Sequence, residues 1–368
     1  MSENPAAEAL GVAVAAGVPV LLWGAPGTGK TSAIRAMARA MDLPCETVIA
    51  SIREPSDFAG LPIVVGDVVR FAPPAWARRL AEAGRGLLFL DELSTAPPAV
   101  QAALLRVVLE RAVGDLTLPD EVAVVAAANP PEQAADGWDL SAPLANRLCH
   151  LSWRAHPRAV ADGLAGGWAA PVIPLLPDGW QVNGPEEILA RGLVAAFLHV
   201  RPALACAPPA DAASAGRGWP SPRTWEMAGR LMAAAGAAGT SDEARSALIR
   251  GAVGDGAGVE FLAWLVEMDL PDPEQVLADP ASFRLPERGD RAYAALASIA
   301  SAVASNPTPE RWTAGWQALG LAAETALDMA AAAARVLAKC RPDGVALPEE
   351  VRMFAPVLRA AGLMPGHG

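Results

Sequence analysis

Cysteine is scarce in this chain of 368 residues, and its placement excludes a disulfide scaffold or a thiolate metal centre. The four cysteines, Cys45, Cys149, Cys206 and Cys340, form no CxxC pair and no cluster with histidine at metal-ligand spacing. Free, mostly buried thiols in a reducing compartment are therefore the simplest interpretation. With 52% hydrophobic and 19% charged residues, the composition is that of a folded protein rather than a disordered one.

The chain also lacks an unbroken apolar run long enough to cross a bilayer. Its N-terminus carries Glu3 and Glu8 where a secretory signal carries positive charge. The apolar stretch that follows is interrupted by Gly11, Gly17 and Pro19. We therefore expect a cytoplasmic protein without a membrane segment.

Basic residues are in deficit, because 29 of them stand against 40 acidic ones and leave a net charge of −11. This balance argues against nucleic acid as the main partner, since binding to a phosphate backbone requires positive charge. Lysine is rarer still, and only Lys30 and Lys339 are present. A chain that uses arginine almost everywhere else has lysine at position 30, where a phosphate-binding loop requires a compact ammonium group.

Residues 24–31 read GAPGTGKT, a complete phosphate-binding loop. An apolar run at residues 18–23 precedes it, and a segment with helical spacing follows it, which is the strand, loop and helix order that the motif requires. In this loop we expect Lys30 to reach the β and γ phosphates of ATP and the Thr31 hydroxyl to be a Mg²⁺ ligand. The predicted nucleotide-binding residues are Gly24, Ala25, Pro26, Gly27, Thr28, Gly29, Lys30 and Thr31 from the loop, together with Asp91.

The order of elements predicts an α/β domain with a parallel sheet over residues 1–155. Apolar runs at residues 44–50, 85–91 and 122–129, together with 148–153, have the character of buried strands. Residues 62–71 and 112–122 read as two β-hairpins. Beyond residue 155 we expect only helices, in one part spanning residues 156–285 and another spanning residues 286–368.

Polar residues follow two of these strands, and the carboxyl edge of an open α/β sheet is where ligands bind. Asp91 would orient Mg²⁺, and Glu92 would polarise the water that attacks the γ-phosphate. Asn129 could hold that water or the phosphate by its amide. A solvated acidic pair and a turn-forming asparagine are the alternatives if these residues have no role in binding.

Two arginines, Arg147 in PLANRL and Arg223 in SPRTW, are candidates for neutralising charge on the transferred phosphoryl group. The alternative for each is an arginine that simply faces solvent.

The ordered set GAPGTGKT, LLFLDEL, AAANPP, LANRL and SPRTW resembles the AAA+ ATPases, and within them the MoxR-like and dynein-related group. The resemblance covers residues 8–240, and the two predicted hairpins fall where that group carries its helix-2 insert and pre-sensor hairpin. It implies that Glu92 is the catalytic base, Asn129 the sensor-1 residue and Arg223 the sensor-2 residue. Arg147 would be an arginine finger acting on the ATP of a neighbouring subunit. Leu148 stands where many relatives have phenylalanine, which leaves Arg154 as the second candidate for the finger.

The resemblance also implies an assembly: a hexameric ring with ATP and Mg²⁺ between subunits. Residues 156–285 would form a helical lid and residues 286–368 a helical extension. Such rings remodel or mature a client, commonly with a protein that contains a von Willebrand factor A domain. Two alternatives remain, a nucleotide-gated scaffold with little turnover and a DNA-directed AAA+ motor, of which the acidic balance disfavours the motor.

Overall fold

The computed structural model describes residues 5–130, 133, 138–168, 170–171 and 173–364. The chain divides into two compact units. The first consists of Met1–Asp178 and Cys206–Val259, and the second of Gly179–Ala205 and Glu260–Gly368. The predicted domain limits near residues 155 and 285 differ from this division and stay a prediction.

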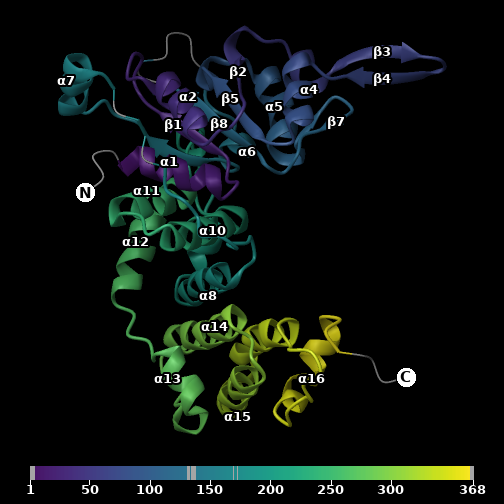
Figure 1. Ribbon diagram of the computed structural model, residues 1–368, viewed down its shortest axis with the longest axis vertical. Coiled ribbons are helices and arrows are strands. Elements are labelled where there is room, and N and C mark those ends of the chain that lie inside the picture. The colour runs from purple at the N-terminus through teal and green to yellow at the C-terminus, as the bar shows by residue number, and fades with distance from the viewer. Residues whose placement is uncertain (1–4, 131–132, 134–137, 169, 172, 365–368) are drawn as a thin grey trace. The chain divides into compact units, whose positions relative to one another are not determined.

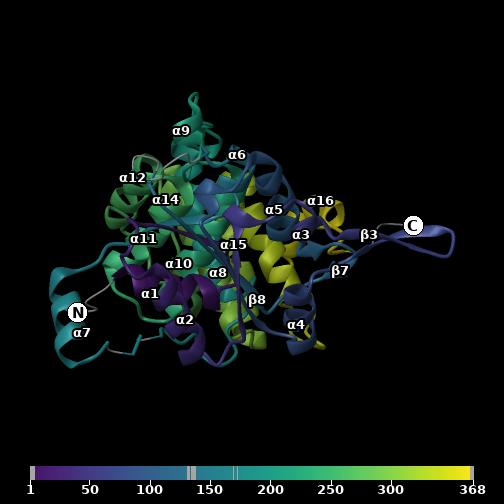
Figure 2. The ribbon, with the colours of Figure 1, turned by 90° about the horizontal axis from the view of Figure 1, so that it is seen from above.

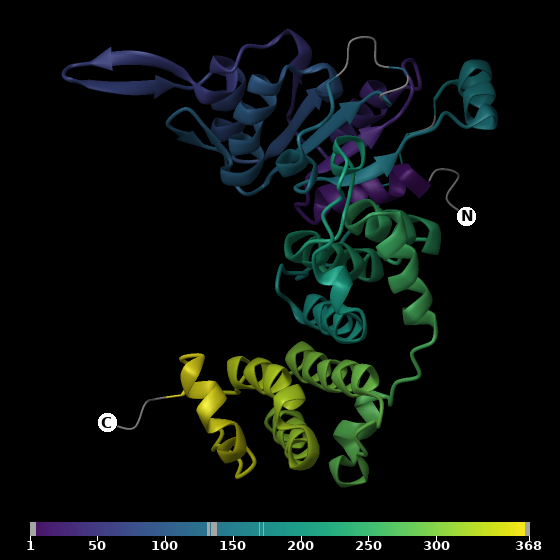
Figure 3. The same cartoon turned by 180° about the vertical axis from the view of Figure 1, so that it is seen from behind.

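Five parallel strands form the main sheet of the first unit, in the order β2, β5, β8, β1, β9 (Figures 1 and 3). They are β1 (Val20–Trp23), β2 (Cys45–Ile49), β5 (Gly86–Asp91), β8 (Val122–Ala128) and β9 (Cys149–Ser152). All five strands run in one direction, so their carboxyl ends lie at the same edge, where Ile49 pairs with Asp91 and Trp23 with Ala128. This arrangement confirms the predicted α/β class with a parallel sheet, and it brings the residues that follow β1, β5 and β8 together.

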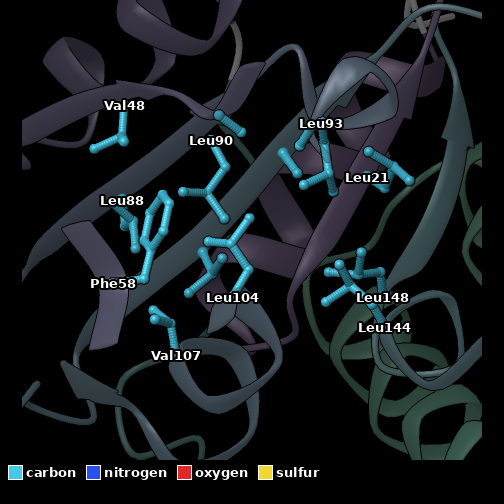
Figure 4. Packing of buried hydrophobic residues seen from close by; sticks show 14 of the residues in the cluster. Leu21, Val48, Phe58, Leu88, Leu90, Leu93, Leu104, Val107, Leu144 and Leu148 are labelled. Atoms are coloured by element: carbon cyan, nitrogen blue, oxygen red, sulfur yellow. The ribbon is translucent and has the colours of Figure 1, made fainter. Parts of the chain in front are cut away.

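Helices cover both faces of this sheet because its strands alternate apolar side chains between two buried sides. On one face, Leu21, Leu88 and Leu90 pack into a core with Leu104 of α5 and Phe58 of α3 (Figure 4). Helix α1 contacts β1, β8 and β9, and α2 contacts β5, without joining that core, so these helices cover the other face. The helices named here are α1 (Pro5–Ala15), α2 (Lys30–Ala40), α3 (Ser56–Ala59) and α5 (Pro98–Glu110).

Two β-hairpins leave the sheet domain where they are predicted. One joins β3 (Leu61–Val65) to β4 (Val68–Ala72), and the other joins β6 (Ala112–Val113) to β7 (Leu116–Thr117). The turn of the second hairpin meets the base of the first, where the backbone N–H of Asp115 donates to the Phe71 carbonyl and the Phe71 N–H donates to the Asp115 carboxylate. The β3–β4 hairpin extends away from the rest of the first unit (Figures 1 and 2), and its apolar side chains are exposed, with Val64 at 76%.

Helices α10 (Pro222–Ala237) and α11 (Asp242–Val253) complete the first unit by packing on each other and on α1. Helix α11 also contacts β9, and a Cβ atom at Gly251 would lie 2.4 Å from the carbonyl oxygen of His150. This close approach explains why residues 206–259 group with the sheet domain. The remaining helices of this unit are α4 (Ala75–Ala83), α6 (Ala142–Ala145), α7 (Pro157–Gly166) and α9 (Ala212–Ala215), with short 3-10 turns at Ala50–Ile52 and Leu93–Thr95.

The second unit contains helices and no strand among its described residues, and it has its own core. Trp312 and Trp316 of α15 are fully buried beside Phe354 of α16, and the Trp312 indole donates to the Leu337 carbonyl. Its helices are α8 (Pro185–Val200), α13 (Pro273–Ala278), α14 (Gly289–Ser305), α15 (Pro309–Lys339) and α16 (Val351–Ala360); α12 (Asp255–Val266) begins in the first unit and ends in the second. Short 3-10 turns lie at Pro202–Ala205 and Pro280–Ser282. Among the described helices of the chain, none has both the length and the apolar character needed to span a membrane.

Candidate active site

The phosphate-binding loop connects β1 to α2, as predicted, and its glycines are required by geometry. Gly27 and Gly29 have φ values of 77° and 84°, in the left-handed region that side chains disfavour. Gly24 is needed for space instead, because a Cβ atom there would lie 2.6 Å from the carbonyl oxygen of Trp153. The loop therefore turns sharply into α2, whose N-terminus carries the partial positive charge that attracts phosphate.

Lys30 is 8% exposed, and oxygen atoms surround its ammonium group. The Nζ atom donates to the carbonyls of Gly24 and Ala25 at 2.5 and 3.1 Å, and to Oδ1 of Asn129 at 3.0 Å. Burial lowers the pKa of Lys30 below its ordinary value, and the nearby carboxylate of Asp91 partly opposes that change. The ammonium is thus held at the loop and directed toward the ends of β1 and β8.

Thr31 and Asp91 meet across the carboxyl edge of the sheet. The Thr31 hydroxyl donates to Oδ2 of Asp91 at 2.9 Å, although 60 residues separate them. A hydroxyl beside a carboxylate is an all-oxygen donor set of the kind that Mg²⁺ prefers, so these two residues fit the predicted metal site.

Glu92 directly follows β5 in an uncommon backbone conformation, with φ at 56°. A side chain in the left-handed region is strained, and such strain concentrates at functional sites. The Ser51 hydroxyl donates to the Glu92 carboxylate. Sequence reasoning missed Ser51, although its position just beyond β2, the neighbour of β5, was an available signal.

Asn129 follows β8, and contacts on two sides fix its position. Its side-chain oxygen accepts from Lys30, and its backbone N–H donates to the hydroxyl of the buried Ser94 at 3.2 Å. Ser94 lies in the turn after the Asp91–Glu92 pair and was also missed. The turn that follows β5 therefore helps to place the residue that follows β8.

One cavity of about 400 Å³ brings most of the predicted site together. Its lining contains Asp91, Glu92 and Asn129, with further residues from the loop and the ends of two strands: Pro26, Gly27, Thr28, Gly29, Lys30, Thr31, Ser32, Ala127 and Ala128. Gly24 and Ala25 lie just outside that lining, but their carbonyls accept from Lys30. The structure thus assembles the phosphate loop, the acidic pair and the asparagine around one space.

The predicted arginines lie elsewhere, since the described residues that line this cavity include neither Arg147 nor Arg223 nor Arg154. Arg147 is half-buried and donates from Nη1 to the Pro143 carbonyl at 2.5 Å. Burial lowers its pKa, and the positive charge of Arg223 lowers it further, so these two guanidinium groups lie near each other. Arg223 and Arg154 are exposed.

Two tryptophans lie beside the loop, Trp23 next to it in the sequence and Trp153 by a hydrogen bond, and sequence reasoning assigned neither of them a role. Trp153 donates from Nε1 to the Thr28 carbonyl at 3.1 Å. Trp23 donates to Nδ1 of His150 at 2.9 Å, and the Arg217 guanidinium lies 3.7 Å from the centre of the Trp23 ring. Burial lowers the pKa of His150 to about 4, so that its ring stays neutral and accepts the indole hydrogen.

The fold and the cavity together define a phosphate-loop nucleotide hydrolase domain. Residues 19–147 match the ATPase family associated with various cellular activities (AAA). This stretch therefore forms an ATPase domain of the AAA type, which confirms the predicted resemblance to MoxR-like AAA+ ATPases.

Two solved structures are similar to this chain. A provisionally assigned ATPase from Cytophaga hutchinsonii has 17% sequence identity and a TM-score of 0.42, over 71% of this chain and 88% of that one. A full-length MCM homolog from Methanopyrus kandleri has 18% identity and a TM-score of 0.38, over 70% of this chain and 53% of that one. No curated protein matches the sequence.

Proposed function

We propose that this chain is a magnesium-dependent, ring-forming ATPase that uses hydrolysis to remodel or mature a partner protein. The observation that carries the enzymatic part is the convergence of Lys30, Thr31, Asp91, Glu92 and Asn129 on one cavity at the carboxyl edge of the sheet. A chain that only bound nucleotide would need the loop but not a carboxylate and an amide beyond it.

The position of each of these side chains supports one role in ATP binding or hydrolysis. The loop amides and the N-terminus of α2 bind the phosphates, and Lys30 exchanges one of its present oxygen partners for a phosphate oxygen. Glu92 accepts a proton from the attacking water, and the Asn129 amide holds that water or the γ-phosphate. Thr31 and Asp91 would hold Mg²⁺, which when bound neutralises charge on the phosphates.

The arginines support a ring. Arg147 and Arg223 lie near each other and away from the cavity of their own chain, which suits groups that complete the site of a neighbouring copy. A head-to-tail interface of this kind closes into a ring when its rotation permits. Six subunits is the number that the family resemblance implies.

We propose that the remodelling driven by ATP hydrolysis acts on a protein client. The β3–β4 hairpin exposes Val64, Val68 and Val69, and an exposed apolar surface of this kind favours contact with protein rather than with nucleic acid. The net charge of −11 supports the same choice. From the resemblance we also propose a partner with a von Willebrand factor A domain, and a cytoplasmic location in which the four unpaired cysteines stay reduced.

ATP turnover by variants tests the enzymatic proposal. Glu92→Gln keeps the shape of the side chain but removes the base, so we expect ATP binding to persist and kcat to fall about 10²- to 10⁴-fold. Turnover close to that of the wild type in this variant would show that Glu92 is not the base. Binding of a client by a wild type that hydrolyses no ATP would favour the scaffold instead.

Mixed assemblies test the ring. Arg147→Ala should lower kcat by about 10³-fold or more, whereas mixing it with Glu92→Gln should restore part of the activity, because each variant supplies what the other lacks. Arg154→Ala is the matched control and should hydrolyse ATP normally. If Arg154→Ala and not Arg147→Ala lost activity and recovered it on mixing, Arg154 would be the finger.

A pull-down tests the partner. A protein with a von Willebrand factor A domain encoded beside this gene should bind the ATP-loaded ring of the Glu92→Gln variant and leave the nucleotide-free ring. Binding that ignored nucleotide would contradict a remodelling role, and tight, salt-sensitive binding of DNA would favour the motor.

A further inference from the structure

Arg147 and Arg223 are 76 residues apart in the sequence, yet their local segments are joined by buried side chains. Arg147 follows α6, whose last turn is closed by backbone bonds from Asn146 N–H to the Ala142 carbonyl and from Arg147 N–H to the Leu144 carbonyl. Arg223 lies in the first turn of α10.

Asn146 makes that connection. Its side chain is 3% exposed, and both ends of its amide are used. Oδ1 accepts from the Ser221 hydroxyl at 2.8 Å, and Nδ2 donates to the Trp219 carbonyl at 3.3 Å. Asn146, which directly precedes Arg147, is therefore hydrogen-bonded to the segment that leads into α10, the helix that contains Arg223.

Ser221 is equally constrained from its own side. It caps α10, accepting from the Thr224 N–H at 3.2 Å, while its own N–H donates to the Thr224 hydroxyl at 2.8 Å. A serine hydroxyl has one hydrogen to donate, and here that hydrogen goes to Asn146. This reciprocal cap fixes the start of α10. A change at Asn146 is therefore transmitted to the first turn of α10, which contains Arg223.

We propose that Asn146 is a positioning residue that holds Arg147 and Arg223 as one unit, aimed at the phosphates bound by a neighbouring copy of this chain. The inference rests on the proposed function, because it requires a site completed by the arginines of a second subunit. Two cations kept close together repel each other until an anion lies between them, and the polyphosphate of ATP is the anion that this ring would supply. The positive charge of Arg223 that acts on Arg147 supports the same arrangement.

The test uses two kinds of subunit, donors that supply the arginines and acceptors that supply the pocket where ATP is hydrolysed. Donor subunits carry Glu92→Gln, so they present intact arginines but cannot hydrolyse ATP. Acceptor subunits carry Arg147→Ala, so they hold an intact base but need an arginine from a neighbour. In a random equal mixture, about one interface in four pairs a donor's arginines with an acceptor's pocket, and only these interfaces hydrolyse ATP.

Asn146→Leu is then placed in one partner at a time. Leucine fills a similar volume but makes neither hydrogen bond. We expect a loss of about 10- to 100-fold when the change is in the donor, as for a catalytic group displaced by about an ångström, and no loss when it is in the acceptor. Ser221→Thr in the donor keeps the hydroxyl and the cap and should stay near the parental mixture; Ser141→Ala, an exposed change in the same segment as Asn146, should do the same.

The outcomes distinguish a failure of the role of Asn146 from a failure of the proposed shared site. An equal loss from Asn146→Leu in donor and acceptor would show a merely structural role and would overturn the inference, as would no loss in either. If the parental mixture without Asn146→Leu hydrolysed nothing while the wild type was active, the shared site of the proposed function would fail, and the inference with it. Nucleotide binding to the donor is followed in parallel and should not change, and thermal melting of the donor checks that the variant is folded.

Discussion

Replacing Lys30 by methionine should separate stability from ATP binding. Lys30 is buried, and its pKa is lowered mainly because burial disfavours the charged ammonium. At neutral pH the folded protein therefore carries a cost for keeping this lysine charged, and raising the pH through the lowered pKa would relieve it. Methionine keeps most of the apolar stem and removes the charge.

The two effects of Lys30→Met differ in size. Without nucleotide, the carbonyls of Gly24 and Ala25 lose a donor, but they adjoin a cavity that water can enter, so we expect the free energy of unfolding to change by less than about 1 kcal/mol. With nucleotide, the loss of a charge-assisted contact to phosphate should cost about 2 to 5 kcal/mol, or about 30-fold to several thousand-fold in Kd.

Thermal melting measures both quantities. At an ATP analogue concentration of about 100 Kd, the wild type gains about 2.7 kcal/mol, or roughly 5 to 10 °C for a unit of this size, and the variant gains less than about 1 kcal/mol. Lys339→Met is the matched control, since Lys339 is the other lysine and is exposed at the end of α15. It should melt and respond to the analogue as the wild type does.

Two results would refute this reasoning. A loss of more than about 2 kcal/mol in nucleotide-free Lys30→Met would mean that the hydrogen bonds of the ammonium outweigh the cost of burying it. An undiminished shift with the ATP analogue would mean that Lys30 does not bind phosphate.

Three further predictions concern the surroundings of the site. His150→Gln keeps a donor and an acceptor for its neighbours and should make the free energy of unfolding less dependent on pH in the acid range. Between pH 6.5 and about 4, the wild type should lose up to about 3 kcal/mol more of this free energy than the variant, because only the unfolded histidine takes up a proton there. Urea midpoints at pH 7 and 5 check this, and parallel losses would contradict it. Ser51→Ala should raise basal kcat several-fold at unchanged Kd, since the hydroxyl occupies the carboxylate of Glu92 that must accept a proton, and a fall in kcat would show instead that Ser51 aids catalysis. Leu104→Ala, at a fully buried position of the sheet core, should lower the free energy of unfolding by about 2 to 5 kcal/mol in guanidinium titrations, and a loss under 1 kcal/mol would contradict the packing.

The sequence alone was enough to predict the local parts of this protein. The buried strands are continuous apolar runs, and the loop after β1 is marked by glycines that its left-handed turns require. Because parallel strands share one carboxyl edge, the residues after β5 and β8 could be expected to meet at the loop, and Lys30 does contact Asn129. These predictions hold because strand, turn and helix preferences are written in neighbouring residues.

Only the tertiary structure decided which distant side chains support the site. Nothing in the residues around Ser94 or Asn146 distinguishes a serine or asparagine with a long-range partner from one that faces solvent. The grouping of residues 206–259 with the sheet domain likewise depends on the approach of Gly251 to β9. Such pairings arise when packing brings separate elements together, so the identity of a single residue cannot encode them.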